Sequence, residues 1–152
     1  MMKLFKQYIG SPNRAKADDH AYFLYKKNRG DVDICDLCNI ETSASKIIAE
    51  YPLFMVITNA FPYAIWEGGL LNEHLMLVPK RHTESIATFT PEENAEFLQL
   101  LSEYDQQGYS YYGRAAGSPY KSIPHQHTHL MQVGTPITRQ IYNRRPYINF
   151  FK

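Results

Sequence analysis

The sequence has little of what marks several large classes of protein. Its 2 cysteines in 152 residues cannot form the several disulfide bridges of a small secreted domain. No apolar run approaches the roughly 18–20 residues of a membrane-spanning helix, and no apolar signal segment follows the initial methionines. Neither sign of charge predominates, because 16 Lys and Arg stand against 15 Asp and Glu, which excludes a histone-like polycation. We therefore expect a cytoplasmic protein with no membrane partner and no nucleic-acid partner.

What is present predicts one globular domain. The length is that of a single domain, and a content of 44% hydrophobic residues suffices for a core. Residues 1–30 are polar and basic, so we expect an N-terminal arm that packs on the domain through residues 22–25. Residues 31–152 are expected to form the domain itself and to end in a basic, aromatic tail.

Short apolar runs predict strands in the first half of the domain. Residues 53–58 and 74–78 are apolar and partly β-branched, which is typical of buried strands. Residues 46–50 fit either a helical turn or a strand. Residues 65–71 are expected to form a loop with an exposed tip.

The clearest local signal is a capping box at Thr90-Pro91-Glu92-Glu93. It predicts a helix over about 91–107, stopped by Gly108. Residues 109–112 and 123–133 are two further strand candidates. The sum is an α+β fold with a mainly antiparallel sheet, one long helix and a short helix.

Three of the 6 histidines lie close together, at His125, His127 and His129. On a strand, alternate side chains share one face, so these rings would project together. A row of imidazoles is a poor core, because each ring carries a polar nitrogen that needs a partner. One ring could attack phosphorus while its neighbours donate hydrogen bonds to phosphate oxygens. Alternatively, the three rings could hold a metal ion with one open position for water.

The segment that begins at Ser122, Ser-Ile-Pro-His-Gln-His-Thr-His-Leu, resembles the signature of the histidine triad (HIT) superfamily. Upstream, Phe-Met-Val-Ile-Thr-Asn-Ala-Phe-Pro-Tyr at 54–63 and His-Leu-Met-Leu-Val-Pro-Lys-Arg-His at 74–82 are similar to the same superfamily, in the same order. The resemblance covers residues 35–131. It implies a HIT-like fold that pairs into a homodimer through the long helix and adjoining strands.

The resemblance also implies an enzyme, a nucleotide hydrolase or nucleotidyl transferase. His127 would attack the α-phosphorus of a nucleotide and hold a covalent nucleotidyl-histidine intermediate until water or another acceptor takes the nucleotide. His125 and His129 would flank this nucleophile. Ser122 would bond the phosphate or a leaving-group oxygen.

By the resemblance, Asn59 would contact the ribose, and Phe61 or Tyr63 would be a wall for a purine base. Arg114 and Lys121 stand where small-nucleotide hydrolases of the family commonly carry Asn and Gln. Their charge could hold extra phosphates or an acidic leaving group, or could serve only surface solubility. The connection from Asn59 to His74 is also longer than is usual in the family. The identity of the leaving group therefore does not follow from the resemblance.

A metal site is implied beside the triad. Cys35 and Cys38 form a C-x-x-C pair, and zinc prefers four thiolate and imidazole ligands in a structural site. The zinc-bearing branch of the superfamily, and the related galactose-1-phosphate uridylyltransferases, similarly combine such a pair with two histidines, which here correspond to His82 and His125. We therefore expect a structural zinc ion.

Two other functions compete with this interpretation. One is a nucleotide-binding regulatory module with vestigial activity. The other is a hydrolase in which the three triad histidines hold zinc directly, although no carboxylate partner is evident beside them.

Overall fold

The structure is a computed structural model that describes residues 13–29, 35–40 and 45–136. Residues 1–12 of the predicted arm and the basic tail lie outside the described residues. Within the described part, no helix is both long enough and apolar enough to cross a membrane.

The centre of the fold is a six-stranded sheet in which every pairing is antiparallel. Its strands are β1 (Ile47–Glu50), β2 (Phe54–Thr58), β3 (Ile65–Trp66), β4 (Gly69–Pro79), β5 (Tyr109–Gly113) and β6 (Thr128–Pro136). Their order is β1-β2-β4-β6-β5, and β3 pairs with β4 off this path. The predicted α+β fold with a mainly antiparallel sheet is confirmed.

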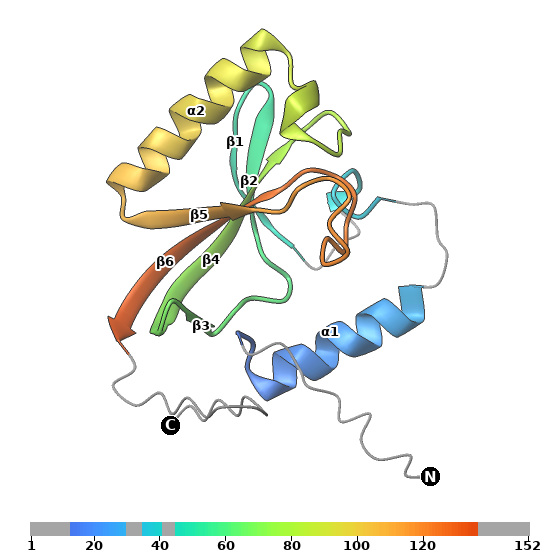
Figure 1. Ribbon diagram of the computed structural model, residues 1–152, viewed down its shortest axis with the longest axis vertical. Helices are drawn as coiled ribbons and strands as arrows, with labels where there is room; N and C mark the ends of the chain where they lie inside the picture. Colours follow the sequence, from blue (N-terminus) through green and yellow to red (C-terminus); the bar gives the residue numbers. More distant parts are fainter. Residues whose placement is uncertain (1–12, 30–34, 41–44, 137–152) are drawn as a thin grey trace.

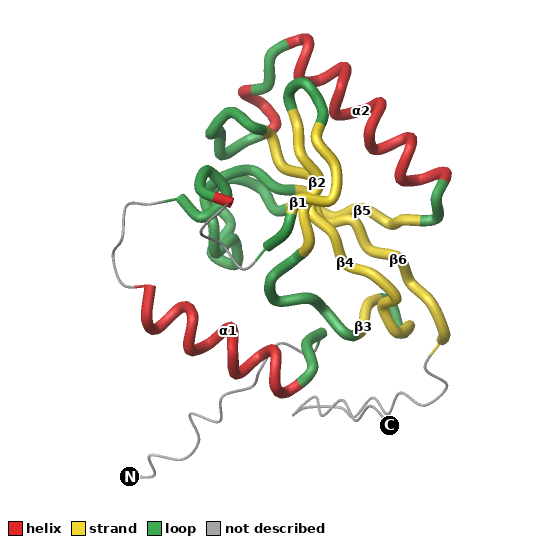
Figure 2. Tube along the Cα trace, turned by 180° about the vertical axis from the view of Figure 1, so that it is seen from behind, coloured by secondary structure: helices red, strands yellow, loops and turns green. Residues whose placement is uncertain are grey.

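Both faces of the sheet are buried, because alternate side chains of the central strands point to opposite sides. The first face packs against helix α2 (Pro91–Gln106) through Leu100 and Tyr104. The second face packs against Leu37 of the segment that carries the two cysteines. Figures 1 and 2 show α2 along one side of the sheet, away from helix α1 (Lys16–Arg29).

Helix α2 begins and ends as the sequence predicts. The Thr90 side chain accepts a hydrogen bond from the Glu93 backbone, and the Glu93 side chain accepts one from the Thr90 backbone, which completes the capping box. Gly108 follows the helix with φ of +83°, a conformation that glycine adopts without strain.

Helix α1 is the main feature that the sequence patterns did not predict. Tyr22 and Tyr25 contact Phe61, with ring centroids 5.3 and 5.0 Å away. Phe23 and Leu24 are 43% and 41% exposed. On a helix, residues three apart share one side and the two between them turn away.

Residues 46–50, which fitted either a helical turn or a strand, contribute strand β1. Two other segments differ from the patterns. Residues 65–71 form a hairpin between β3 and β4, whose turn residues Glu67 and Gly68 both have positive φ, as the favoured two-residue hairpin turns require. Strand β6 begins at Thr128, so His125 and His127 precede the strand instead of lying in it.

Candidate functional site

The site lies on the face of the sheet opposite α2. His74 of β4 and Met76 share a face with His129 of β6, because Met76 is the register partner of His129. His127 immediately precedes β6, and its ring meets that of His129 edge to face with centroids 5.2 Å apart. His74, His127 and His129 are all buried, between 5% and 6% exposed.

The hydrogen bonds of His74 determine which of its nitrogens carries the proton. Its Nδ1 accepts a hydrogen bond from the Tyr63 backbone N–H at 2.9 Å, so this nitrogen has no proton. The proton of the neutral ring is therefore on Nε2, which lies 2.9 Å from Nδ1 of His129 and donates to it.

This donation determines the state of His129 in turn. Because Nδ1 of His129 accepts, the proton of this neutral ring is on Nε2. That Nε2 atom is buried and has no hydrogen-bond partner among the described residues. A buried donor without a partner is costly, so the atom is suited to bind an acceptor that a ligand supplies.

His127 has the opposite arrangement. Its Nδ1 lies 2.8 Å from the His125 carbonyl oxygen, which can only accept, so Nδ1 donates and carries the proton. The lone pair is then on Nε2, for which the described residues provide no hydrogen-bond partner. A nucleophilic nitrogen and the orphaned donor of His129 thus belong to two rings in contact.

Burial keeps these rings neutral near pH 7. It lowers the pKa of His127, and it lowers the pKa of His129 well below 6.5, with a smaller contribution from His127 and His74. The pKa of His74 falls to about 3, mainly by burial and then by the Arg14 charge. A neutral His127 retains the lone pair that a nucleophile needs.

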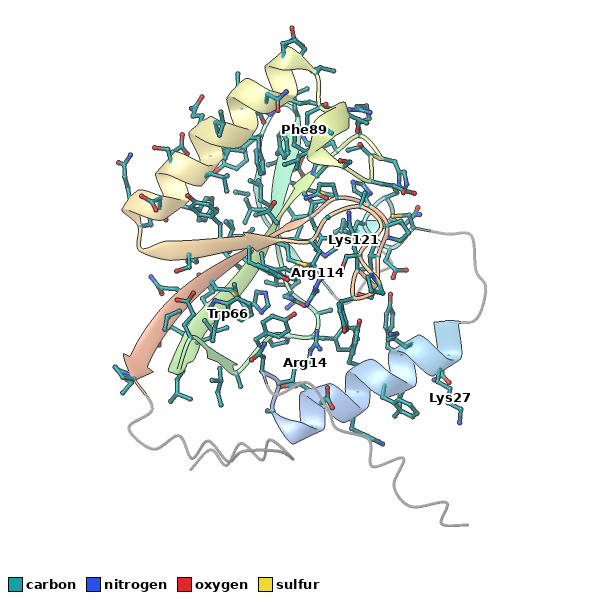
Figure 3. All side chains as sticks on the ribbon, in the orientation of Figure 1. Arg14, Lys27, Trp66, Phe89, Arg114 and Lys121 are labelled. Carbon is teal, nitrogen blue, oxygen red and sulfur yellow. The ribbon has the colours of Figure 1, made fainter. Side chains whose placement is uncertain are left out.

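Basic side chains surround the histidines. Arg114 donates from Nη2 to the Tyr63 hydroxyl at 3.2 Å, and Lys121 donates to the Glu84 carbonyl at 2.6 Å and to the Gln126 side chain at 2.9 Å. Both cations lower the pKa of His127. Figure 3 shows Arg14, Arg114 and Lys121 following one another from the start of α1 toward the loop before the triad.

The other predicted nucleotide-binding residues lie at different distances from the triad. The Asn59 amide nitrogen lies 3.1 Å from Nε2 of His74, and because both nitrogens carry protons this is a close contact and not a hydrogen bond; it places Asn59 beside His74. Phe61 packs against the tyrosines of α1. Ser122 is exposed, and no hydrogen bond joins it to the triad within the described residues.

Cys35, Cys38, His82 and His125 form a cluster whose four ligand atoms all lie within 4.8 Å of one another. Cys38 Sγ lies 3.2 Å from Nδ1 of His82 and 3.4 Å from Nδ1 of His125, and Cys35 Sγ lies 3.5 Å from the latter. Such separations fit two ligands of one tetrahedral metal ion, since Zn–S and Zn–N bonds of about 2.3 and 2.0 Å imply about 3.5 Å between them.

The protonation of His125 also fits a metal ligand. Its Nε2 lies 2.9 Å from the Pro79 carbonyl oxygen and therefore donates, which leaves the lone pair of Nδ1 toward the two cysteines. The His125 ring thus belongs to the cysteine cluster, and within the described residues the three triad rings do not form a single group of metal ligands.

Of the aromatic group around His129, sequence reasoning named only Tyr63, as an alternative to Phe61 for the base wall. The rings of Tyr63 and Trp66 stack nearly parallel with centroids 5.7 Å apart, and Trp66 also contacts Tyr112. Tyr63 and Tyr112 each lie against His129, at 5.8 and 6.0 Å. Only the hairpin turn at Glu67 and Gly68 could have indicated that Trp66 returns to the sheet.

The fold has counterparts among solved structures. A HIT family hydrolase from Clostridium thermocellum superposes with a TM-score of 0.53 at 17% sequence identity, over 72% of this chain and 98% of that one. A histidine triad nucleotide-binding protein from Sulfolobus tokodaii superposes with a TM-score of 0.52 at 19% identity, over 75% and 80%. One from Candida albicans superposes with 0.51 at 13% identity, over 72% and 87%.

No model of a known protein family matches the sequence, and no curated protein matches it either. The protein is a mixed α+β domain, with an antiparallel sheet that carries a site of three buried histidines. More particularly, the chain has the histidine triad fold, as the sequence resemblance implied.

Proposed function

We propose that the protein is a nucleotide hydrolase or nucleotidyl transferase that acts at the α-phosphate through a nucleotidyl-His127 intermediate. The observation that carries this proposal is the pairing of two nitrogens: Nε2 of His127 has a lone pair, and the adjacent ring of His129 has a buried, unpartnered Nε2–H. Solved proteins of the same fold are named a HIT family hydrolase and histidine triad nucleotide-binding proteins, which supports it.

In the first step, Nε2 of His127 attacks the α-phosphorus. A nitrogen–phosphorus bond forms, the bond from phosphorus to the leaving group breaks, and the leaving group departs with the bonding electrons. The Nε2–H of His129 donates to an oxygen on which charge develops. The imidazolium formed on His127 is stabilised by the His125 carbonyl, which accepts from Nδ1–H at 2.8 Å.

In the second step, water or another acceptor attacks the same phosphorus from the side opposite His127. The nitrogen–phosphorus bond breaks, and its electrons return to Nε2 as the lone pair. With water as the acceptor, the products are a nucleoside monophosphate and one released proton, and His127 regains its starting state.

The remaining predicted residues bind the substrate. Asn59 is proposed to contact the ribose and Phe61 to lie against a purine base. Arg114 and Lys121 are proposed to hold negative charge on the phosphates or on the leaving group, and their effect on the pKa of His127 supports positions close to the nucleophile. Ser122 is proposed to bond a leaving-group oxygen.

Cys35, Cys38, His82 and His125 are proposed to hold a structural zinc ion. Four protein ligands close the site, so the ion would supply rigidity, and two thiolates balance its charge. Holding the His125 ring also fixes the backbone carbonyl that orients His127. The cluster therefore supports the nucleophile indirectly.

The proposal includes a homodimer that pairs through α2 and β5. Strand β5 is an edge of the sheet, and Tyr111 of β5 and Leu98 of α2 are 54% and 65% exposed. Tyr111 shares a side of its strand with Tyr109, which packs on α2, so the two exposed side chains lie on the same side of the sheet. A single-chain mass in light scattering would contradict the dimer.

The test uses hydrolysis of a nucleoside 5′-phosphoramidate and of a nucleotide labelled at the α-phosphate. His127→Ala is expected to lower kcat by about 10⁴-fold or more, because the nucleophile is lost, while His20→Ala, on the exposed side of α1, leaves kcat unchanged. Label should attach to the wild-type chain, survive base and be released by acid, and His127→Ala should carry none. Wild-type turnover in His127→Ala would reject the covalent mechanism.

A further inference from the structure

Arg14, in the segment just before α1, is held in place from three directions. Its guanidinium carbon lies 4.2 Å from the ring centre of Tyr22 and 4.8 Å from that of Tyr63, and its Nε donates to the Phe61 carbonyl at 3.1 Å. The backbone beside it is also anchored, because the Asn13 carbonyl accepts from the Ala64 and Ile65 N–H groups. Guanidinium stacking of this kind fixes the plane of the cation.

Most of the donors of this guanidinium are unused. A guanidinium has five N–H donors in a planar fork, and the hydrogen bond to Phe61 uses the one on Nε. Within the described ranges, no acceptor bonds the two terminal nitrogens of Arg14 and no carboxylate forms an ion pair with them. A guanidinium that is held in place and has unused terminal N–H donors is suited to bind an anion such as a phosphate.

Tyr63 connects Arg14 to the histidine site. The Tyr63 ring lies 4.8 Å from His74 and 5.8 Å from His129, and its hydroxyl accepts from Arg114. Two arginines therefore contact one buried tyrosine that packs on the same side of the sheet as the histidines.

The two arginines lie at different places beside the histidines. The Arg114 guanidinium lies 5.5 Å from the ring centre of Tyr112, which contacts His129, and that of Arg14 lies over Tyr63. Figure 3 shows Arg114 between Arg14 and Lys121, so Arg14 is farther than Arg114 from the loop before the triad.

We infer that Arg14 is a specificity-determining residue that binds a phosphate group of the substrate other than the α-phosphate. This inference rests on the proposed function, which assigns the α-phosphate to His127 and His129. The preferred substrate is then a nucleotide with at least one phosphate beyond the α-phosphate, in which Arg114 binds nearer to the reacting centre and Arg14 farther away. A substrate with an uncharged amine as leaving group would leave Arg14 unused.

Trp66 provides the readout. It is the 1 tryptophan of the chain, and its ring stacks on Tyr63, so its fluorescence reports a ligand that binds beside Tyr63. The probes are AMP and α,β-methylene-ADP, which cannot be cleaved at the α-phosphate. We expect wild type to bind α,β-methylene-ADP about tenfold more tightly than AMP, as one charge-assisted phosphate contact provides.

Arg14→Gln is expected to reduce this preference to about twofold or less and to leave the AMP Kd within about twofold. Lys27→Gln is the matched control, since Lys27 is an exposed cation of α1, the helix that follows Arg14, and points away from the site (Figure 3); this variant should leave the preference unchanged. Arg14→Lys, whose ammonium cannot stack in the same way, keeps the charge and guards against a folding defect in Arg14→Gln; the preference should fall in this variant too.

A tenfold preference that persists in Arg14→Gln would overturn the inference. So would an equal loss of affinity for both nucleotides, because Arg14 would then act only by supporting Tyr63. The proposed function fails separately, if hydrolysis of a nucleoside 5′-phosphoramidate does not depend on His127. Retained His127-dependent hydrolysis together with an unchanged preference would overturn only the role of Arg14.

Discussion

The position of single protons decides the chemistry of this site. One backbone N–H, that of Tyr63, donates to Nδ1 of His74 and so places the proton of that ring on Nε2. His74 then donates to Nδ1 of His129, which leaves the proton of His129 on the nitrogen that has no partner. A histidine outside the triad thus determines which nitrogen of a triad histidine is the donor and which is the acceptor.

This chain of hydrogen bonds predicts that His74 acts through His129. His129→Ala should lower kcat by about 10²-fold, as loss of one preorganised donor does, and His74→Ala should lower it by about tenfold, because the proton of His129 is no longer held on Nε2. The double variant should be no slower than His129→Ala alone, since the two residues work as a unit. Steady-state kinetics of the four proteins measure the coupling.

Melting curves of the same four proteins separate this role from a folding defect. His74 is buried and bonded to the Tyr63 backbone, so its removal also lowers stability. His74→Ala is expected to lower stability whether or not His129 is present, but to lower kcat only in the protein that retains His129. Effects on kcat that multiply in the double variant would show that His74 has an independent function.

Among the elements, the start of α2 is tied to the end of β4. Glu93 accepts from the Thr90 backbone in the capping box and also from Nε and Nη2 of Arg81, at 2.9 and 2.7 Å. Arg81 in turn donates to the Thr88 carbonyl. Because Arg81 precedes His82 in the chain, the same carboxylate that caps the helix also fixes the segment that carries a predicted zinc ligand.

Glu93 gives this contact a pH dependence. Its pKa is lowered from 4.5, first by the hydrogen bond from Arg81, so its stabilising effect is fully present above pH 4.5 and is lost as the pH falls through the lower folded value. Glu93→Gln should therefore destabilise the protein by about 1–2 kcal/mol at pH 7. The difference from wild type should shrink as the pH falls below 4.5.

Urea unfolding of wild type and Glu93→Gln, at pH 7 and below pH 4.5, measures the difference in their free energy of unfolding under each condition. Glu92→Gln makes the same charge change one residue earlier, at an exposed side chain that does not contact Arg81, and should have the smaller effect. A loss of stability in Glu93→Gln that is the same at all pH values would contradict the assignment to the charged carboxylate.

Elements with local signals were predictable from the sequence, and elements that depend on distant contacts were not. The capping box at Thr90 is complete within four residues, so α2 could be placed almost to the residue. Strand β6 begins at Thr128 because the His125 ring turns to the cluster at Cys35 and Cys38, which no periodicity near the triad records. Arg14 contacts Tyr63, which lies 49 positions farther along the sequence, and nothing near Arg14 distinguishes it from the other basic residues of the arm.

At the scale of the whole molecule, the cysteine cluster joins three parts of the chain. Cys35 and Cys38 precede the sheet, His82 follows β4, and His125 belongs to the loop before β6. The segment with the cysteines also buries Leu37 against the second face of the sheet. A metal ion here would connect the cysteine segment, which packs on the sheet through this apolar cluster, to the ends of β4 and of the loop before β6, so its loss should affect the stability of the entire domain.

Removal of one ligand tests this at the level of global stability. Purified protein is expected to contain about one zinc ion per chain, and Cys38→Ser should contain none and should lose roughly 3 kcal/mol of stability, a fall of about 6–12 °C in Tm for a chain of this size. His129→Ala should retain its zinc, because His129 is outside the cluster. Zinc that is lost with His129 but kept in Cys38→Ser would instead place the metal on the triad and require a different reaction, in which the histidines bind an ion and none of them attacks phosphorus.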